Sequence, residues 1–257
     1  MKKIAKVFAL VVLMIMGGQA MAQTRGAMFL GASFPMSDFG EFDGFKEFAL
    51  TEYGESDAGA GIGFNAGLKW YFNVGVEGLG VMLSVDGFYN GPNSDLKTAY
   101  RNEKLWIDGF GSSLENFSFN STPKYINVPA MLGINYRYYL NPNFGIYVEA
   151  GAGGNLGLIT DMETVFDSHV SAIHGKYKVT TDYDKAFSFA YQAGAGIEVA
   201  KNLVVGCSFY HLGARQVEGS RTVKMVDGNA TPINETEYLE YGKVTPIMLL
   251  GRIGFSF

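Results

Sequence analysis

The sequence has a single cysteine, Cys207, so the chain cannot form an intrachain disulfide. Beyond residue 22 it also lacks any apolar run that approaches the ~20 residues of a membrane-spanning helix. Basic residues are in the minority, with 20 Lys and Arg against 25 Asp and Glu and a net charge of −5. This balance argues against nucleic acid as a partner. Because no intrachain disulfide is possible, the stability of the fold must come from packing and backbone pairing within one domain.

The amino terminus has the three parts of a secretory signal peptide. Lysines at positions 2, 3 and 6 precede an unbroken apolar run over residues 7–16, and Ala20 and Ala22 form an A-x-A cleavage site. The apolar run is too short to cross ~30 Å of hydrocarbon as a helix. We therefore predict a signal peptide over 1–22 and a mature domain over 23–257. An exported chain without a later helical span is either a soluble exported protein or a membrane β-barrel.

The composition favours strands, because 34 glycines and 14% aromatic residues alternate along the mature chain without a collagen or linker period. The segment 245–257 shows the clearest period of two. One parity holds apolar side chains and the other is mixed. The apolar set is Ile247, Leu249, Ile253, Phe255 and Phe257.

Eight segments alternate in this way and are expected to form strands. They cover residues 25–35, 59–73, 79–89, 125–140, 144–159, 187–199, 203–212 and 245–257. The connections between them alternate in length. Short turns at 74–78, 141–143 and 200–202 separate long loops at 36–58, 90–124, 160–186 and 213–244. This layout is typical of an outer-membrane barrel, with short periplasmic turns and long extracellular loops.

A soluble lipocalin-like barrel is the alternative with eight strands. The two differ in which parity faces water. In 125–140 one parity is apolar throughout, from Ile126 and Val128 to Leu140, whereas the other carries Asn127, Arg137 and small residues. The polar parity is too poor in charge for a water-facing surface and suits a narrow lumen. We therefore predict an all-β, eight-stranded antiparallel up-and-down transmembrane barrel.

Several short motifs resemble the outer-membrane β-barrel domain common in Bacteroidetes, the PorT-like relatives of OmpA- and OmpX-type small barrels. They are Y-I-N-V-P from Tyr125, G-A-G-G from Gly151, G-A-G-I-E from Gly194 and Y-H-L-G from Tyr210. The resemblance implies a bacterial outer-membrane location and contact with lipid. It also implies that the barrel-assembly machinery recognises the closing strand through Ile253, Phe255 and Phe257. Some relatives are accessory parts of protein secretion systems.

The lumen parity carries three cations and three carboxylates. Buried charges require partners, so we expect a salt-bridge network that plugs the lumen. Across the turn 141–143, Asn135 should oppose Glu149, which makes Arg137 a diagonal neighbour of that carboxylate. A gated ion path or an acid–base carboxylate pair is the functional alternative. The six residues are Lys69, Asp86, Arg137, Glu149, Glu198 and Arg252.

No pattern predicts catalysis, a cofactor or a metal. His211 invites comparison with outer-membrane lipid A deacylases, but Gly213 stands where their serine nucleophile would be. Asp167, His169 and His174 share one loop, yet their spacing is weak evidence for a metal site. The glycine pattern at 61–66 lies within a strand with no helix behind it, so it is not a dinucleotide-binding turn.

The long loops carry whatever specificity the chain has. Loop 36–58 has seven acidic residues interleaved with four phenylalanines, and 226–229 has a hairpin-turn sequence. Residues 164–173 and 176–181 suggest an extended hairpin. We expect a structural or interaction protein that anchors in the membrane and displays its loops to an extracellular or envelope protein or glycan. The alternatives are a narrow small-solute channel and a lipid-modifying enzyme.

Overall fold

The computed structural model describes residues 24–41, 58–96, 115–168, 175–200, 202–228 and 234–257. Within these ranges the chain forms thirteen strands, one short 3-10 helix, η1 (Ser37–Phe39), and a helical segment at 94–96. None of the helical structure in these ranges is long and apolar enough to cross a membrane. The predicted signal peptide, with Ala20 and Ala22, lies outside the described residues.

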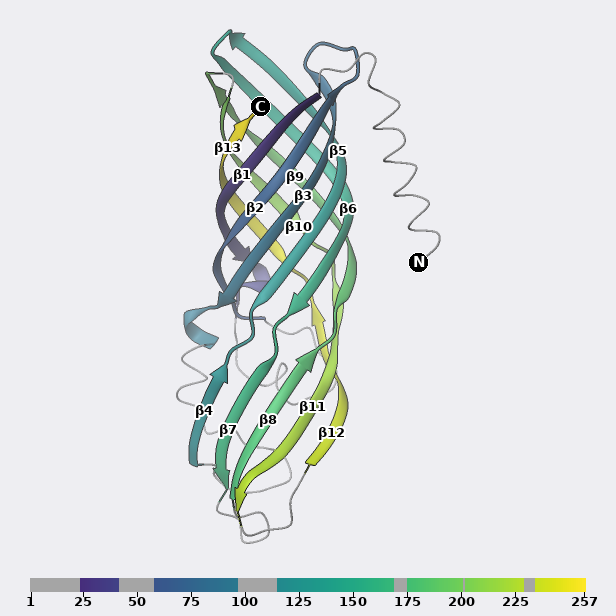
Figure 1. Ribbon diagram of the computed structural model, residues 1–257. Helices are drawn as coiled ribbons and strands as arrows, with labels where there is room; N and C mark the ends of the chain where they lie inside the picture. The colour runs from purple at the N-terminus through teal and green to yellow at the C-terminus, as the bar shows by residue number, and fades with distance from the viewer. Residues whose placement is uncertain (1–23, 42–57, 97–114, 169–174, 201, 229–233) are drawn as a thin grey trace.

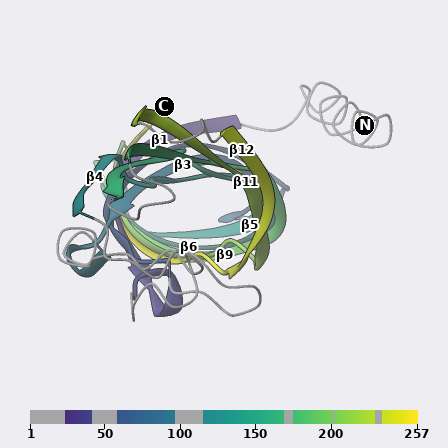
Figure 2. The same ribbon diagram turned by 90° about the horizontal axis from the view of Figure 1, so that it is seen from below.

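Eight of the strands close into an antiparallel barrel in the order β1-β13-β10-β9-β6-β5-β3-β2, which confirms the predicted fold (Figures 1 and 2). Chain neighbours pair with one another, and β1 pairs with β13 to close the wall. The strands are β1 (Thr24–Met36), β2 (Ala60–Asn73), β3 (Leu79–Pro92), β5 (Tyr125–Asn141), β6 (Phe144–Ile159), β9 (Ala186–Val199), β10 (Leu203–His211) and β13 (Ile247–Ser256).

The short turns gather at one end of the barrel, together with the start of β1 and the end of β13, at the top of Figure 1. We name this the short-turn end and the opposite end the long-loop end. The turn after β2 needs backbone that only glycine adopts readily, since Gly75 and Gly78 have φ of 85° and 77°. The three tight connections therefore fix strand neighbours locally, as the sequence predicts.

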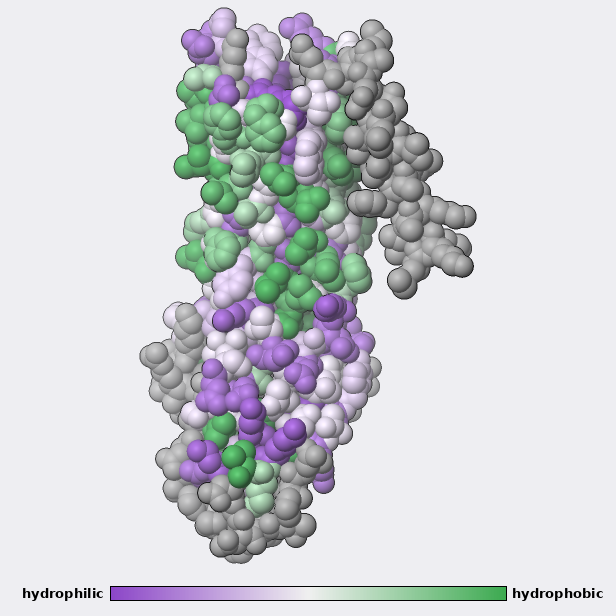
Figure 3. All heavy atoms as spheres, viewed as in Figure 1, coloured by the Kyte–Doolittle hydropathy of each residue, from purple (hydrophilic) through white to green (hydrophobic). Residues whose placement is uncertain are grey.

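The outer surface of the barrel is a belt of exposed apolar side chains, visible as the green zone of Figure 3. On β5 the exposed set includes Val128, Leu132 and Ile134, while Asn127 and Asn135 on the other parity are buried. The same alternation runs along β13, where Leu249, Ile253 and Phe255 are exposed. The apolar parity thus faces outward, which suits lipid and excludes the lipocalin-like arrangement.

The long loops contain five more strands that the sequence analysis did not separate as a sheet. They form a second, open sheet in the order β12-β11-β8-β7-β4, beyond the long-loop end of the barrel (Figure 1). Its surface in Figure 3 is mostly hydrophilic. The strands are β4 (Glu115–Ser121), β7 (Met162–Ser168), β8 (Gly175–Tyr183), β11 (Arg215–Gly228) and β12 (Asn234–Val244).

The predicted hairpin in the third long loop is confirmed as the antiparallel pair β7 and β8, although its tip at 169–174 lies outside the described residues. The hairpin predicted from the turn sequence at 226–229 is present as the antiparallel pair β11 and β12. These strands are separate from β10 and β13, because the chain breaks between β10 and β11 at Gly213, with φ of 75°, and between β12 and β13 at Pro246. The backbone N–H of Leu212 donates to the carbonyl of Pro246 at 2.8 Å and holds the two breaks together.

Candidate functional site: the charged lumen

The six charged residues predicted for the lumen all lie on its inner wall. Five of the side chains are at most 5% exposed, and the Arg137 side chain is 11% exposed. Strand alternation explains their direction, since each shares its parity with buried neighbours on the same strand. The structure divides them into three ionic clusters along the barrel axis, and it adds one cation at each end that the sequence analysis missed.

The first cluster lies in the middle of the lumen and joins β3 to β13. Arg252 Nη2 lies 3.2 Å from Asp86 Oδ1, and the hydroxyl of Tyr210 donates to the other carboxylate oxygen at 2.8 Å. The guanidinium also lies over the ring of Tyr210, 4.9 Å from its centroid. Gly67 leaves the space for this carboxylate, because a Cβ there would overlap Asp86 Oδ1.

The second cluster lies toward the short-turn end and joins β2 to β6. Lys69 Nζ donates to Glu149 Oε1, and both side chains are 1% exposed. Tyr71 donates from its hydroxyl to the other oxygen of Glu149 at 3.3 Å. Asn135 opposes Glu149 in the register of β5 and β6, as predicted. The partner of this carboxylate is nevertheless Lys69 from across the lumen rather than the diagonal neighbour Arg137.

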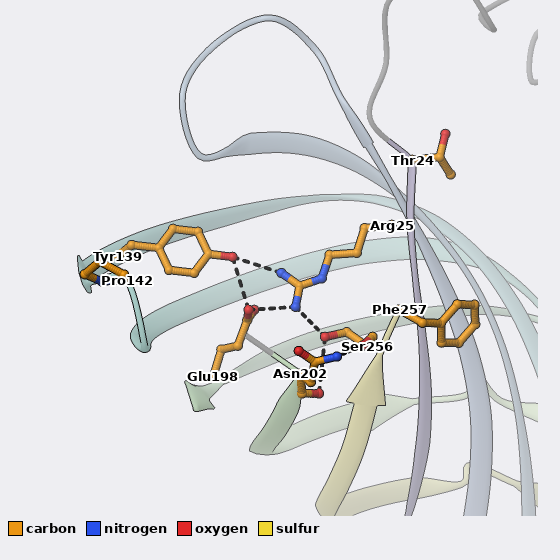
Figure 4. A pocket seen from close by; sticks show the side chains of 8 residues that line it. All are labelled: Thr24, Arg25, Tyr139, Pro142, Glu198, Asn202, Ser256 and Phe257. Atoms are coloured by element: carbon orange, nitrogen blue, oxygen red, sulfur yellow. Dashed lines mark hydrogen bonds and ion pairs between the residues drawn. The ribbon is translucent and has the colours of Figure 1, made fainter. Parts of the chain in front are cut away.

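The third cluster occupies the mouth at the short-turn end (Figure 4). Glu198 accepts from Arg25 Nη2 at 2.6 Å and from the hydroxyl of Tyr139 at 3.2 Å, while Arg137 Nε lies 4.0 Å from its second oxygen. Arg25 Nη2 also donates to Ser256. A recess of about 690 Å³ opens beside these groups. One carboxylate here serves two guanidinium groups.

The sequence analysis missed Arg25 because the inner parity of β1 is not polar. Phe29, on the same parity, is buried in the lumen and Met28 is exposed to the outside, so apolar residues occupy both faces of this strand. The clue that was available is register, since Arg25 lies on the parity of Ala27 and Ser33, both of which are buried. Arg215, the second missed cation, enters the lumen from β11 at the long-loop end and is 4% exposed.

The residues that the sequence analysis considered for catalysis or metal binding lie in different parts of the structure. His211 lies on the outward parity of β10, where its ring stacks on Tyr191 at 4.7 Å and its Nδ1 accepts from the N–H of Gly213 at 3.2 Å. Ser208 is buried on the opposite parity of the strand. Of the loop residues considered as metal ligands, Asp167 lies on β7, and His169 and His174 lie outside the described residues. Among the residues that are described, no group of three or more His, Cys, Asp or Glu could hold a metal ion.

Three solved structures of outer-membrane proteins are similar to this chain. Ail of Yersinia pestis is 15% identical, with a TM-score of 0.36, and the match covers 91% of this chain and 99% of Ail. OprG of Pseudomonas aeruginosa is 11% identical, with a TM-score of 0.40 and coverage of 93% and 98%. A major outer membrane protein of Thermus thermophilus is 12% identical, with a TM-score of 0.42 and coverage of 91% and 98%.

No curated protein matches the sequence. The model of the family described as outer membrane protein beta-barrel domain matches residues 8–226, which is most of the chain. That match agrees with the closed eight-stranded wall, its outward apolar parity and its short-turn and long-loop ends. The short-turn end is thus periplasmic, and the long-loop end with its second sheet is extracellular. The chain belongs to the outer membrane protein beta-barrel domain family and resides in the bacterial outer membrane.

Proposed function

We propose that the protein is an anchor with a closed lumen, and that its extracellular sheet and loops bind a partner at the cell surface. The observation that carries the proposal is the set of three ionic clusters that cross the lumen. Each joins strands on different sides of the wall and places paired side chains in the lumen, which supports a blocked path for solutes. Buried ion pairs of this kind are costly to break one partner at a time, which favours a permanent plug over a gate.

The extracellular sheet supports a display role because it extends well beyond the apolar belt (Figures 1 and 3). Its last strand, β12, exposes side chains of both parities, including Thr236, Glu237 and Tyr238. Tyr238 is 60% exposed and Val226 on β11 is 59% exposed. Exposed aromatic and apolar side chains on such a surface suit contact with a protein or glycan. The resemblance to PorT-like Bacteroidetes barrels makes an accessory role in protein secretion or in adhesion the form we favour.

Planar-bilayer recording tests the closed lumen. The purified barrel should insert without steady single-channel events, under conditions in which a general porin gives regular conductance steps. Steady open events from the wild-type protein would replace this proposal with the narrow-channel alternative. A variant with Lys69→Ser and Glu149→Ser loses one cluster and should also lack steady events, because the other two clusters still cross the lumen.

Photo-crosslinking in intact cells tests the display role. A photoreactive amino acid at Val226 probes the extracellular sheet, and the same residue at Val76, which is 56% exposed in a periplasmic turn, is the matched control. We expect Val226, and not Val76, to capture a discrete protein or glycan-bearing species from the envelope. Equal patterns from both sites would show that the extracellular sheet has no dedicated partner.

The proposal includes no catalytic activity. His211 is engaged with Tyr191 and with the backbone of Gly213, and the position two residues along from it carries no nucleophile. Deletion of the protein should leave the lipid A mass spectrum unchanged. A shifted lipid A mass that returns with the wild-type gene, and not with His211→Ala, would favour the lipid-modifying enzyme instead.

A further inference from the structure

Arg215 is the one lumen cation among the described residues without a carboxylate partner. It begins β11, and its guanidinium turns back into the long-loop end of the barrel, where it is 4% exposed. It lies close against the inner wall at Gly157, where a Cβ would overlap Arg215 Nη1. The other four lumen cations, Arg25, Lys69, Arg137 and Arg252, each have a carboxylate oxygen within 4.0 Å.

Within the described part of the chain, the side chain of Arg215 has one hydrogen-bond partner, an amide. Arg215 Nη1 donates to Asn127 Oδ1 at 2.7 Å, and the same oxygen accepts from Asn155 Nδ2 at 3.2 Å. These two donors fix the orientation of the Asn127 carboxamide. Both Asn127 Nδ2 and Arg215 Nη2 are buried without an acceptor among the described residues, and Asn155 Oδ1 is buried there without a donor. Two unpartnered donors thus lie on adjoining groups that are already in contact.

Beyond Asn127 and Asn155, this guanidinium lies beside apolar side chains. A buried cluster that includes Tyr125, Ile159, Leu212, Val217 and Val244 closes the long-loop end of the lumen. A cation in such a place without a counter-charge is strongly unfavourable. The Arg215 guanidinium has five N–H groups, all of which are hydrogen-bond donors.

We propose that Arg215 and Asn127 form a binding site for a small monovalent inorganic anion, chloride in the extracellular medium. An anion at this position accepts hydrogen bonds from Arg215 Nη2 and Asn127 Nδ2, and it neutralises the charge of Arg215. Since no second cation of the described residues lies in the site, the ligand is limited to one negative charge. The surrounding apolar cluster limits it to a few atoms, which excludes glycans and phospholipid headgroups.

Crystallography with bromide in place of chloride is the direct test. The wild-type protein should show a bromide anomalous peak in contact with the Arg215 guanidinium and the Asn127 amide. Asn127→Asp places a carboxylate where the amide was, so the site should then contain its own counter-charge and the peak should disappear. A wild-type structure without bromide at Arg215, or with a carboxylate of the chain in that position, would overturn the proposal. So would a peak that persists in Asn127→Asp.

Stability in solution gives an independent readout. At constant ionic strength, replacement of gluconate by chloride should raise the unfolding midpoint of the wild-type protein by about 3 °C at ten times the dissociation constant. Asn127→Asp should fold without chloride and show no such shift. Arg221→Gln, at an exposed cation paired with Glu237 on the extracellular sheet, is the matched control and should keep the full shift. Equal midpoints of the wild-type protein in the two salts would overturn the proposal.

Discussion

Arg252 and Asp86 meet across the lumen with their nearest atoms 3.2 Å apart, from strands that are three positions apart around the barrel wall. Neither side chain is more than 1% exposed. The hydroxyl of Tyr210 completes the coordination of the carboxylate. The pair therefore links β13, next to the β1–β13 seam of the barrel, to the opposite part of the sheet.

Asp86→Asn should destabilise the barrel by about 3 kcal/mol, because it leaves the Arg252 guanidinium buried beside a neutral amide. Urea unfolding in lipid vesicles, followed by tryptophan fluorescence, measures the change. The double variant Asp86→Leu with Arg252→Met removes both charges and should recover much of that loss. The account would be contradicted if the double variant lost as much stability as Asp86→Leu and Arg252→Met lose in total when each is made alone. Arg221→Gln, at an exposed ion pair, should cost less than about 1 kcal/mol.

Gly206→Ala should destabilise the barrel by about 1–3 kcal/mol through overpacking of the lumen. The Cβ that it adds would overlap the hydroxyl of Tyr147 and lie 2.7 Å from the carbonyl of Ala195. Thermal unfolding on heated electrophoresis, where folded and unfolded barrels migrate differently, reports the change.

Two comparisons make the Gly206 prediction specific. Gly251→Ala adds a Cβ with nothing within 4 Å and should stay within about 0.5 kcal/mol of the wild type. Gly206→Ala combined with Tyr147→Phe removes the overlapping hydroxyl and should regain part of the stability. If Gly251→Ala proves as harmful as Gly206→Ala, the cause lies in strand propensity and not in the lumen.

The barrel was predictable because its information is local. Side-chain alternation and the short turns set each strand, its inward parity and its neighbours, so that even the opposition of Asn135 and Glu149 follows from the turn between β5 and β6. The partner of Glu149 was not predictable in the same way. Lys69 reaches Glu149 from a strand three positions away around the wall. The distance across the lumen between two such strands depends on the radius and stagger of the closed barrel, which no single hairpin determines.

The extracellular sheet was predictable only in part for a related reason. The hairpin of β7 and β8 has a local signal, whereas the pairing of β8 with β11 joins segments from different long loops. The position of Arg215 depends on the same tertiary arrangement. Its side chain reaches the lumen because the chain turns at Gly213, so a residue from a predicted loop completes the inner wall.

Leu132→Arg should cost about 2–4 kcal/mol, because it places a charge near the middle of the lipid-facing belt of β5. The wild-type side chain is 56% exposed on the outer surface. Val226→Arg is the matched control, since Val226 is 59% exposed on the extracellular sheet and should change the stability by no more than about 0.5 kcal/mol. Equal losses at both sites, measured by urea unfolding in vesicles, would show that Leu132 does not face lipid.

Glu163 on β7 should titrate below the ordinary range of a glutamate. Its carboxylate accepts hydrogen bonds from Lys178 on β8 and from Asn120 on β4, and these lower its pKa. Both partners bind the charged form, so they stabilise the folded sheet at neutral pH. A lowered folded-state pKa contributes stability above the unfolded pKa, and that contribution disappears as the pH falls through the folded pKa.

NMR titration of the barrel labelled with ¹³C at glutamate side chains tests this expectation. The Glu163 carboxyl should remain ionised at pH values where an ordinary glutamate side chain has begun to protonate. Lys178→Met removes the first and largest cause, so the pKa of Glu163 should rise toward the ordinary glutamate value. Asn120→Ala should move it in the same direction by less, because the bond from Lys178 ranks above that from Asn120. A Glu163 resonance that titrates in the ordinary glutamate range in the wild-type protein would mean that β4, β7 and β8 do not hold this arrangement in solution.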